Sequence, residues 1–350
     1  MSEELNDTGS GGDTGDTGEM EALDALLALD ALEADERSDA EQRLALWPLE
    51  QAAAIVPLAE AVSTDPPTHL RGDVLTVALT RRPAGRPVRS PEALLPAEAF
   101  RRTIEEFSAL LGSLADDEWD VVAHEEHGRV RDLVAHLVGV ERLNLRWLDP
   151  ADDVPYLPDH VEATRPVVEA FAAAPPVEVM RAWRESALAV LATAGHYDGG
   201  RQIQFHDISV SVDGLLTMRT FELWAHGLDI AHATSRPVPM LDDARLLLMS
   251  SRLMGALPGA LAYRGVSAGQ RTARFVLTGP AGGCYDIALD LGGPAPAPGY
   301  QPDTTIVADV VDLCLVAAAR LAHDELQSTV EGDPTLAELV LANVDAFARD

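Results

Sequence analysis

Three side chains have the residue types and spacing of a metal site: His136, Glu222 and His226. Glu222 and His226 are four residues apart in a stretch with helical periodicity, so both project from one helix face, flanked by Met218 and Asp229. His136 lies beside the apolar stripe of another predicted helix, so its imidazole should point inward. One carboxylate and two imidazoles leave one coordination position open, as catalytic zinc sites do.

The neighbours of Glu222 also favour a bound cation. Glu222 lies among Phe221, Leu223 and Trp224, and a carboxylate is costly to bury there without a partner. The same spacing is also typical of a hydrogen-bonded Glu–His pair on a helix, with His136 as an ordinary core histidine. The spacing alone leaves both interpretations open.

The elements that position these residues belong to a chain with five distinct stretches. The first is poor in apolar residues and is predicted to be a disordered acidic tail. Leu-rich short helices, an Arg/Pro/Gly-rich linker, a helix bundle and a small α+β domain follow. The stretches are 1–19, 20–80, 81–96, 97–258 and 265–350.

Periodicity places individual elements in the last two stretches. Helices are expected over 97–114, 129–148, 161–173, 176–194, 213–234 and 241–257. Two alternating segments around the Gly-rich turn at 279–283 predict strands. The segments 303–326 and 334–348 are predicted to be helices. We therefore expect a mainly α protein with a small C-terminal α+β domain.

Composition excludes several classes of function. The formal net charge of −31 disfavours nucleic acid and anionic membranes as partners. The sequence contains no lysine, which excludes a Walker phosphate loop and Schiff-base chemistry. Two distant cysteines, a start without the features of a secretory signal, and no apolar run of membrane-spanning length suggest a cytoplasmic protein.

Two motifs resemble the mycothiol-dependent maleylpyruvate isomerase family, a branch of the DinB-like four-helix bundles. The motifs are WD…GRVRDLVAHLVGVERL within 119–143 and GLLTMRTFELWAHGLDIAHA at 214–233. The resemblance covers roughly 97–258 and implies a DinB-like four-helix bundle. It also implies a metal-dependent enzyme that uses a low-molecular-weight thiol to act on a small electrophilic substrate. The thiol cofactor of this family is mycothiol.

The resemblance assigns roles to residues of this chain. It implies that His136, Glu222 and His226 bind a divalent metal, for which zinc is the expected ion, and that Arg219 and Asp229 lie at the cofactor site. The metal would convert the thiol to a thiolate that attacks the substrate.

The resemblance extends into the C-terminal unit. It implies that Arg320 is a catalytic residue that meets substrate carboxylates. An arginine on a helix flank, paired with Asp324, is an equally good interpretation of the same residue.

The segment HEEHGR at 124–129 departs from the family pattern. It lacks the tryptophan and cysteine often found before the first metal helix, which puts the cofactor geometry in doubt. Its histidines, His124 and His127, are predicted to be structural or exposed, as are His206 and His232.

Residues 20–80 resemble the anti-sigma-factor domains of actinobacteria. The residues at the zinc-ligand positions of those domains are Arg43, Trp47 and Glu50, so the expected domain is helical and holds no zinc. This suggests an alternative function as a transcriptional regulator that binds a sigma factor through residues 20–80, with the metal bundle as sensor or scaffold.

Overall fold

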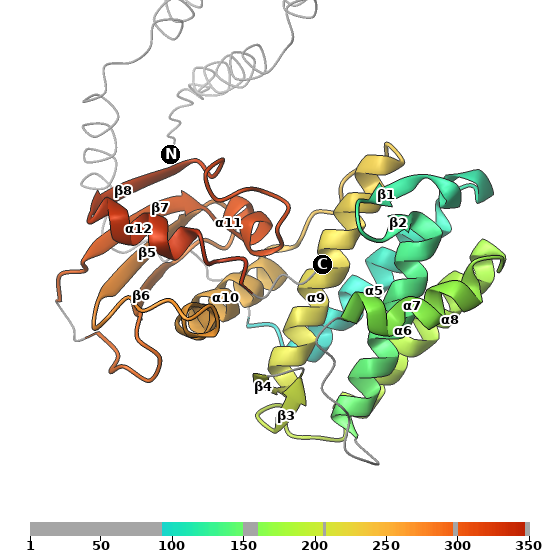
Figure 1. The fold of residues 1–350 in the computed structure, drawn as a ribbon, viewed down its shortest axis with the longest axis horizontal. Helices are drawn as coiled ribbons and strands as arrows, with labels where there is room; N and C mark the ends of the chain where they lie inside the picture. The colour runs from blue at the N-terminus through green and yellow to red at the C-terminus, as the bar shows by residue number, and fades with distance from the viewer. Residues whose placement is uncertain (1–92, 150–159, 206–207, 297–299, 347–350) are drawn as a thin grey trace, which may run out of the picture. The chain divides into compact units, whose positions relative to one another are not determined.

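The described residues form a bundle of long helices followed by a small mixed sheet with its own helices (Figure 1). This computed structural model describes residues 93–149, 160–205, 208–296 and 300–346, all within the compact unit Arg89–Asp350. The predictions for 1–19, 20–80 and 81–92 lie outside the described residues.

The described elements comprise eight α-helices, one short 3₁₀ helix and eight strands. The helices are α5 (Pro96–Gly112), α6 (Val130–Leu148), α7 (His160–Phe171), α8 (Pro176–Ala194), α9 (Val212–Ala233), α10 (Asp243–Tyr263), α11 (Val310–Ala317), α12 (Pro334–Leu341) and the 3₁₀ helix η1 (Asp116–Asp120). The strands are β1 (Val122–His124), β2 (Gly128–Arg129), β3 (Gln202–Phe205), β4 (Ile208–Ser211), β5 (Thr272–Thr278), β6 (Cys284–Ala288), β7 (Thr304–Asp309) and β8 (Ser328–Gly332).

Helices α5, α6, α8 and α9 make the bundle, with α7 lying against α6. Helix α5 packs on α8 and α9, and α6 packs on α8. Their apolar stripes meet in one core that includes Phe100, Ile104, Leu133, Trp183 and Leu215. The mainly helical prediction is therefore confirmed for the described residues.

Local sequence explains where the bundle helices begin. Helices α5 and α8 start with a proline, whose missing N–H is not needed in a first turn. The Ser211 side chain caps α9 by accepting a hydrogen bond from the backbone N–H of Gly214. Helix α10 continues past the expected end at residue 257, to Tyr263, with Pro258 inside it.

The C-terminal sheet has the strand order β6-β5-β7-β8. Strands β5 and β6 form the expected antiparallel hairpin around the Gly-rich turn, where Gly279 has a positive φ of 88°. Strand β7 lies parallel to β5 and antiparallel to β8. Strand β6 carries the chain back along β5, so β7 starts beside the beginning of β5 and runs parallel to it.

The prediction of one long helix over 303–326 is wrong. Residues Thr304–Asp309 form strand β7, and only Val310–Ala317 are helical. The β-branched run Thr-Thr-Ile-Val favours a strand, and alternate side chains are buried along it. Asp309 then ends the strand and caps α11 by accepting hydrogen bonds from two backbone N–H groups.

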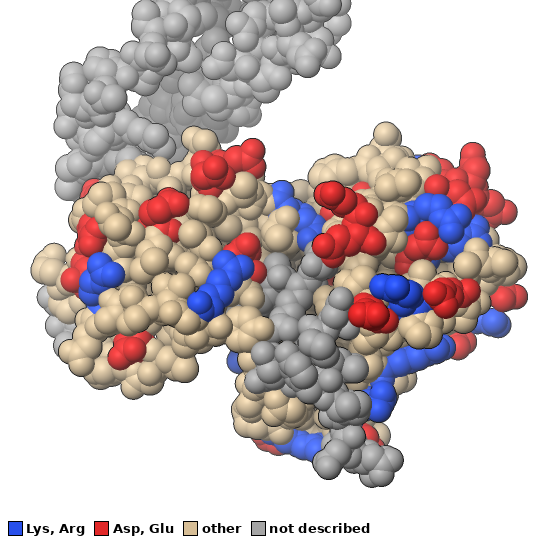
Figure 2. Space-filling model, viewed as in Figure 1, with Lys and Arg blue, Asp and Glu red and all other residues tan. Residues whose placement is uncertain are grey.

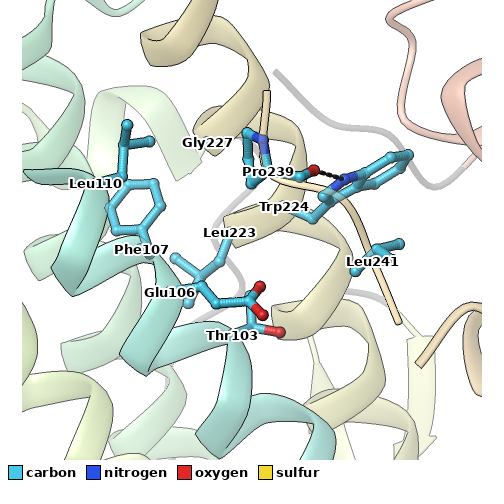
Figure 3. Close-up of a pocket in the computed structure, with 9 residues that line it drawn as sticks. All are labelled: Thr103, Glu106, Phe107, Leu110, Leu223, Trp224, Gly227, Pro239 and Leu241. Atoms are coloured by element: carbon cyan, nitrogen blue, oxygen red, sulfur yellow. Dashed lines mark hydrogen bonds between the residues drawn. The ribbon is translucent and has the colours of Figure 1, made fainter. Parts of the chain in front are cut away.

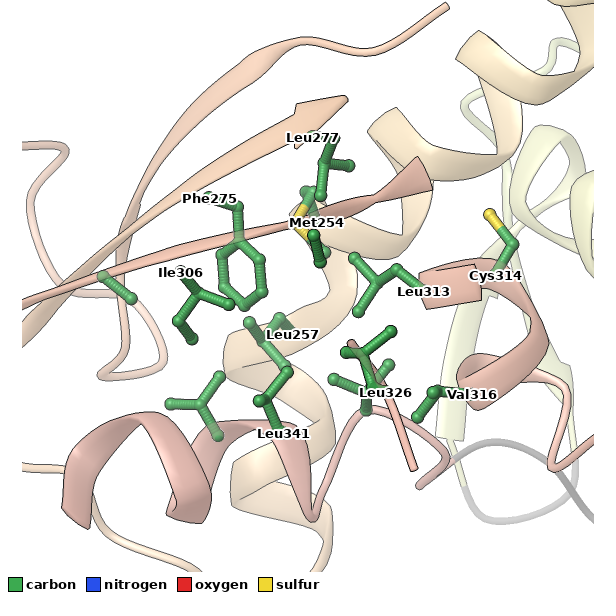
Figure 4. Packing of buried hydrophobic residues seen from close by; sticks show 14 of the residues in the cluster. Met254, Leu257, Phe275, Leu277, Ile306, Leu313, Cys314, Val316, Leu326 and Leu341 are labelled. Carbon is green, nitrogen blue, oxygen red and sulfur yellow. The ribbon is translucent and has the colours of Figure 1, made fainter. Parts of the chain in front are cut away.

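Helix α10 belongs to the core of the C-terminal sheet, although the sequence placed it in the bundle stretch. Its buried side chains Met254 and Leu257 pack with Phe275, Ile306 and other residues of the sheet and its helices (Figure 4). The sequence predicts no apolar run of membrane-spanning length. Judged by length and composition alone, however, α10 could cross a membrane. Here its apolar face packs within the protein core, which accounts for that composition.

Charged side chains are scattered over the surfaces of both the bundle and the C-terminal sheet. On the face in Figure 2, acidic groups occur on both parts with arginines interspersed among them. Surface ion pairs of the described residues include Arg274 with Asp286 and the part-buried pair Arg101 with Glu98. Exposed pairs of this kind contribute little to stability.

Candidate metal centre

Helix α6 carries His136 into the interior of the bundle. The apolar residues Val130, Leu133 and Leu137 of this helix are fully buried in the bundle core. His136 is 1% exposed. The prediction that its imidazole points inward is confirmed.

The hydrogen bonds of His136 assign its tautomer. The Thr164 hydroxyl donates its single proton to the backbone carbonyl of Val161 at 3.0 Å, so at His136 it can only accept. His136 Nδ1, 2.7 Å from that oxygen, must therefore carry the hydrogen. The lone pair lies on Nε2, which is buried and has no hydrogen-bond partner among the described residues.

Electrostatics keep His136 neutral. Burial lowers its pKa strongly, and the neighbouring His127, His226 and His160 lower it further. A neutral imidazole with its Nδ1–H satisfied is the form that binds a metal through Nε2.

A glycine in α6 permits the contact between His136 and Thr164. A Cβ at Gly139 would lie 2.6 Å from Cγ2 of Thr164 and 2.8 Å from its Cβ. Those distances are shorter than a van der Waals contact. Helix α7 can therefore bring its threonine to the histidine only because residue 139 has no side chain.

Helix α9 places Glu222, His226 and Asp229 along one side. Nδ1 of His226 lies 3.1 Å from Oδ2 of Asp229. Burial opposes ionisation of Asp229, but hydrogen bonds from His226 and Arg320 outweigh it and lower the pKa. The ionised carboxylate accepts the Nδ1–H of His226, which leaves the lone pair on Nε2, as on His136.

Arg320 reaches this helix from the C-terminal unit. Its Nε and Nη2 donate to the Asp229 carboxylate at 3.0 and 2.7 Å, and Nη2 lies 3.3 Å from Nδ1 of His226. Ala319, in the left-handed region at φ 55°, terminates α11 just before it. Asp229 is thus a carboxylate that pairs with Arg320.

Arg219 forms a buried network with two glutamates. Its Nε and Nη2 donate to Oε1 of Glu141 at 3.2 and 2.7 Å, and Nη1 donates to Oε2 of Glu222. Arg219 and Glu141 are 1% and 0% exposed. Burial raises the pKa of Glu141 against the opposing charge of Arg219. Burial also opposes ionisation of Glu222, but Arg219 and His226 outweigh it and lower that pKa.

The hairpin β1–β2 brings two further histidines, His124 and His127, to this region, although the sequence predicts only that they are structural or exposed. The rings of His127 and His136 are stacked with their centres 4.0 Å apart. The ring centre of His127 also lies 5.5 Å from that of His226. The ring centre of His124 lies 5.7 Å from that of His226. The ring centre of His160, in α7, lies 5.3 Å from that of His136. His206 lies outside the described residues, and His232 is exposed, as predicted.

The arrangement is a cluster of ligand residues rather than a finished coordination sphere. Within residues 93–149, 160–205, 208–296 and 300–346, no three His, Cys, Asp or Glu side chains meet the geometry of a metal site. One oxygen of Glu222 is held by Arg219. Metal binding therefore requires adjustment of the Glu222 side chain and of the imidazoles around it.

A small crevice on another side of α9 is separate from this cluster (Figure 3). Leu223, Trp224 and Gly227 of α9 line it, together with Phe107 of α5 and Pro239. The Trp224 indole N–H donates to the Pro239 carbonyl at 3.3 Å. The lining is mainly apolar and its one carboxylate, from Glu106, is bound by Arg245. It offers no group suited to metal or acid–base chemistry.

Sequence reasoning missed Thr164, Glu141 and His127. Glu141 could have been noticed as an acidic residue within the buried stretch of α6. Gly139, a glycine inside a helix, could have indicated a close approach by another element. Nothing in the sequence identifies Thr164 as the partner of His136, because 28 residues separate them.

Comparison with known proteins supports part of the resemblance that the sequence motifs suggested. Residues 100–231 match the family model described as the mycothiol maleylpyruvate isomerase N-terminal domain. That segment contains His136, Glu222 and His226, whereas Arg320 lies outside it. Comparison with curated protein sequences gave no match.

Two solved structures are similar to this chain. They are the mycothiol-dependent maleylpyruvate isomerase, with 17% identity and a TM-score of 0.45, and a mutant of it, with 15% identity and a TM-score of 0.44. Each similarity covers 67% of this chain and 91% of the other.

Proposed function

We propose that this chain is a divalent-metal protein in which His136, Glu222 and His226 hold the metal. The observation that carries the proposal is the His136 imidazole, which is buried and neutral, with its Nε2 lone pair lacking a hydrogen-bond partner among the described residues. A buried acceptor without a partner costs free energy. A metal ion bound at Nε2 would remove that cost.

The neighbours of the other two ligands support the same assignment. Asp229 orients His226 through Nδ1, as carboxylates commonly orient metal-binding histidines. Arg219 holds Oε2 of Glu222 and favours the ionised carboxylate that a metal requires. Zinc suits a set of two imidazoles and one carboxylate. Arg219 and Asp229, assigned to cofactor binding by resemblance, thus act directly on the ligands.

The proposed activity is thiol-dependent isomerisation or transfer on a small electrophile, with mycothiol as the thiol suggested by the matching domain family. A divalent metal at this site would lower the pKa of a bound thiol. The chain's own residues orient the ligands and keep the Glu222 carboxylate ionised. Arg320 lies beside Nδ1 of His226, so we propose that it positions the Asp229–His226 pair and meets an anionic substrate that enters there.

Metal analysis of the purified full-length protein tests the metal site. We expect one zinc or another divalent ion per chain, and loss of most of it in His136→Ala. His196→Ala, which removes an exposed histidine elsewhere, is the matched control and should retain the metal. Wild-type protein without affinity for zinc or nickel would refute the proposal. Thiol dependence is then tested by turnover of an electrophile with and without mycothiol.

The alternative function, sigma-factor binding through residues 20–80, rests on the sequence pattern alone. Co-purification of the full chain from its native host should recover a sigma factor if this function is correct. A variant lacking residues 20–80 should not recover it. Recovery of no sigma factor, together with thiol-dependent turnover, would leave the enzyme as the supported function.

A further inference from the structure

A chain of buried polar side chains joins helix α6 to the candidate ligand Glu222 on helix α9. It runs from Asn144 and Glu141 of α6 through Arg219 to Glu222. Both oxygens of Glu141 accept hydrogen bonds. Nε and Nη2 of Arg219 donate to Oε1 at 3.2 and 2.7 Å, and Nδ2 of Asn144 donates to Oε2 at 3.2 Å. Contacts at both oxygens therefore fix the Glu141 carboxylate in place.

The charges in this chain do not balance. One guanidinium, that of Arg219, lies between the carboxylates of Glu141 and Glu222, so the ionised set carries one negative charge in excess. An excess charge in a protein interior costs free energy unless a further cation compensates it. A divalent ion bound by Glu222 would supply that positive charge.

The two carboxylates are not equivalent partners of Arg219. The guanidinium directs Nε and Nη2 at Glu141 but only Nη1 at Glu222. The side chain of Glu141 is 0% exposed, whereas that of Glu222 is 28% exposed. Glu222 also has to move relative to Arg219 before it can meet a metal ion. Glu222 is therefore the carboxylate that can leave the guanidinium, and Glu141 is the one that stays.

We propose that Glu141 is a positioning residue for the metal ligand Glu222. The inference rests on the metal site proposed above. Glu141 keeps the buried guanidinium of Arg219 paired while Glu222 turns toward the metal, so this turn leaves no unpaired cation in the interior. Without Glu141, Arg219 would have only Glu222 as a carboxylate partner among the described residues. Releasing Glu222 would then leave a buried cation uncompensated, which is strongly unfavourable.

A buried ion pair that merely joined α6 to α9 would behave differently. Its loss would lower stability and distort the site whether or not residue 219 carried a charge. The proposed role requires that charge, because Glu141 acts on Glu222 only through Arg219. The coupling between residues 141 and 219 therefore separates a positioning role from a purely structural one.

Zinc titration of the full-length protein in a double-mutant cycle measures this coupling. Glu141→Gln keeps the shape of the side chain and removes its charge, and it should lower zinc affinity about 10–100-fold, as for other residues that support metal ligands. Arg219→Gln should itself bind zinc, because no guanidinium then holds Glu222. In that background Glu141→Gln should change the affinity by less than about twofold, the error within which independent changes add. The matched control is Glu185→Gln, at an exposed position of α8, which should bind zinc as the wild type does.

The outcomes separate this inference from the proposed function. Unchanged zinc affinity in Glu141→Gln would overturn the inference and leave the metal site intact. Equal losses in both backgrounds would also overturn it, and so would a folded Arg219→Gln protein that binds no zinc. Wild-type protein that binds no zinc would overturn both proposals. If a variant does not fold, the crystal structure of the zinc-loaded wild-type protein decides. Arg219 paired with Glu141 alone supports the inference, and any other pairing of Arg219 overturns it.

Discussion

The interior of the bundle between α6 and α9 and the interior beneath the C-terminal sheet are both buried, but they contain different chemistry. Beneath the sheet the buried side chains are mainly apolar, as with Phe275, Ile306 and Leu313, and the buried polar ones, such as Ser250 and Thr304, are uncharged. Between α6 and α9 the fully buried groups include Arg219 and Glu141. Apolar burial stabilises a fold directly, whereas buried charges cost desolvation that their pairing must offset. The charged interior therefore contributes less to stability than apolar packing of the same volume would, which agrees with its proposed role in positioning metal ligands.

The largest expected effect comes from Arg219→Ala. Removal of the guanidinium leaves the carboxylate of Glu141 buried without its partner, which should lower the free energy of unfolding by about 3–5 kcal/mol. Urea denaturation measures this loss. The double variant Arg219→Met with Glu141→Leu should recover most of it, because the fully buried carboxylate of Glu141 is gone and the Glu222 carboxylate, which also loses Arg219, is 28% exposed. Equal losses in the single and double variants would contradict the explanation by charge.

Phe275→Ala should destabilise the protein without altering metal affinity. The side chain is fully buried in the core beneath the sheet, and its loss leaves a cavity that costs about 3–5 kcal/mol. Chemical denaturation and zinc titration below the unfolding range measure the two quantities. The control is Leu291→Ala, which truncates a side chain that is 65% exposed. A change in zinc affinity in Phe275→Ala would show that the two interiors are coupled.

Thr164→Val should lower metal affinity rather than stability, the reverse of the result expected for Phe275→Ala. It keeps the shape of the side chain but removes the oxygen that accepts from Nδ1 of His136. Metal affinity should fall about 10–100-fold, as for other supporting residues of metal sites.

Gly139→Ala provides an independent test of the same contact, since its new Cβ would push Thr164 away. We expect a similar loss of affinity in calorimetric zinc titrations. Unchanged affinity in both variants would show that Thr164 does not orient the ligand.

Asp309→Ala should have the smallest effect. The side chain caps α11 through hydrogen bonds from the backbone N–H groups of Val311 and Asp312, and such caps contribute about 1 kcal/mol. Thermal denaturation measures the loss, and Asp290→Ala, at an exposed turn, is the control. A loss equal to that of Phe275→Ala would mean that the cap also positions the core.

Local sequence patterns predicted the helices of the bundle because each helix buries one face. The apolar residues of that face recur in the sequence at helical spacing. The same reasoning failed at Thr304–Asp309, where helix α11 follows the apolar and β-branched residues of strand β7 without a connecting loop. A short apolar run is compatible with a strand or a helix until its neighbours are known. Here the pairing of β7 with β5 and β8 decided the outcome.

The candidate site likewise contains residues whose placement follows from local spacing and residues whose placement only packing decides. The sequence by itself determined that Glu222 and His226 share one helix face and that His136 points inward, because helical geometry depends on spacing alone. Only the tertiary structure decided that Thr164 assigns the His136 tautomer, that Arg320 meets Asp229, and that His127 joins the cluster. Those contacts join segments far apart in the chain or carried on a hairpin, so packing decides them rather than local spacing.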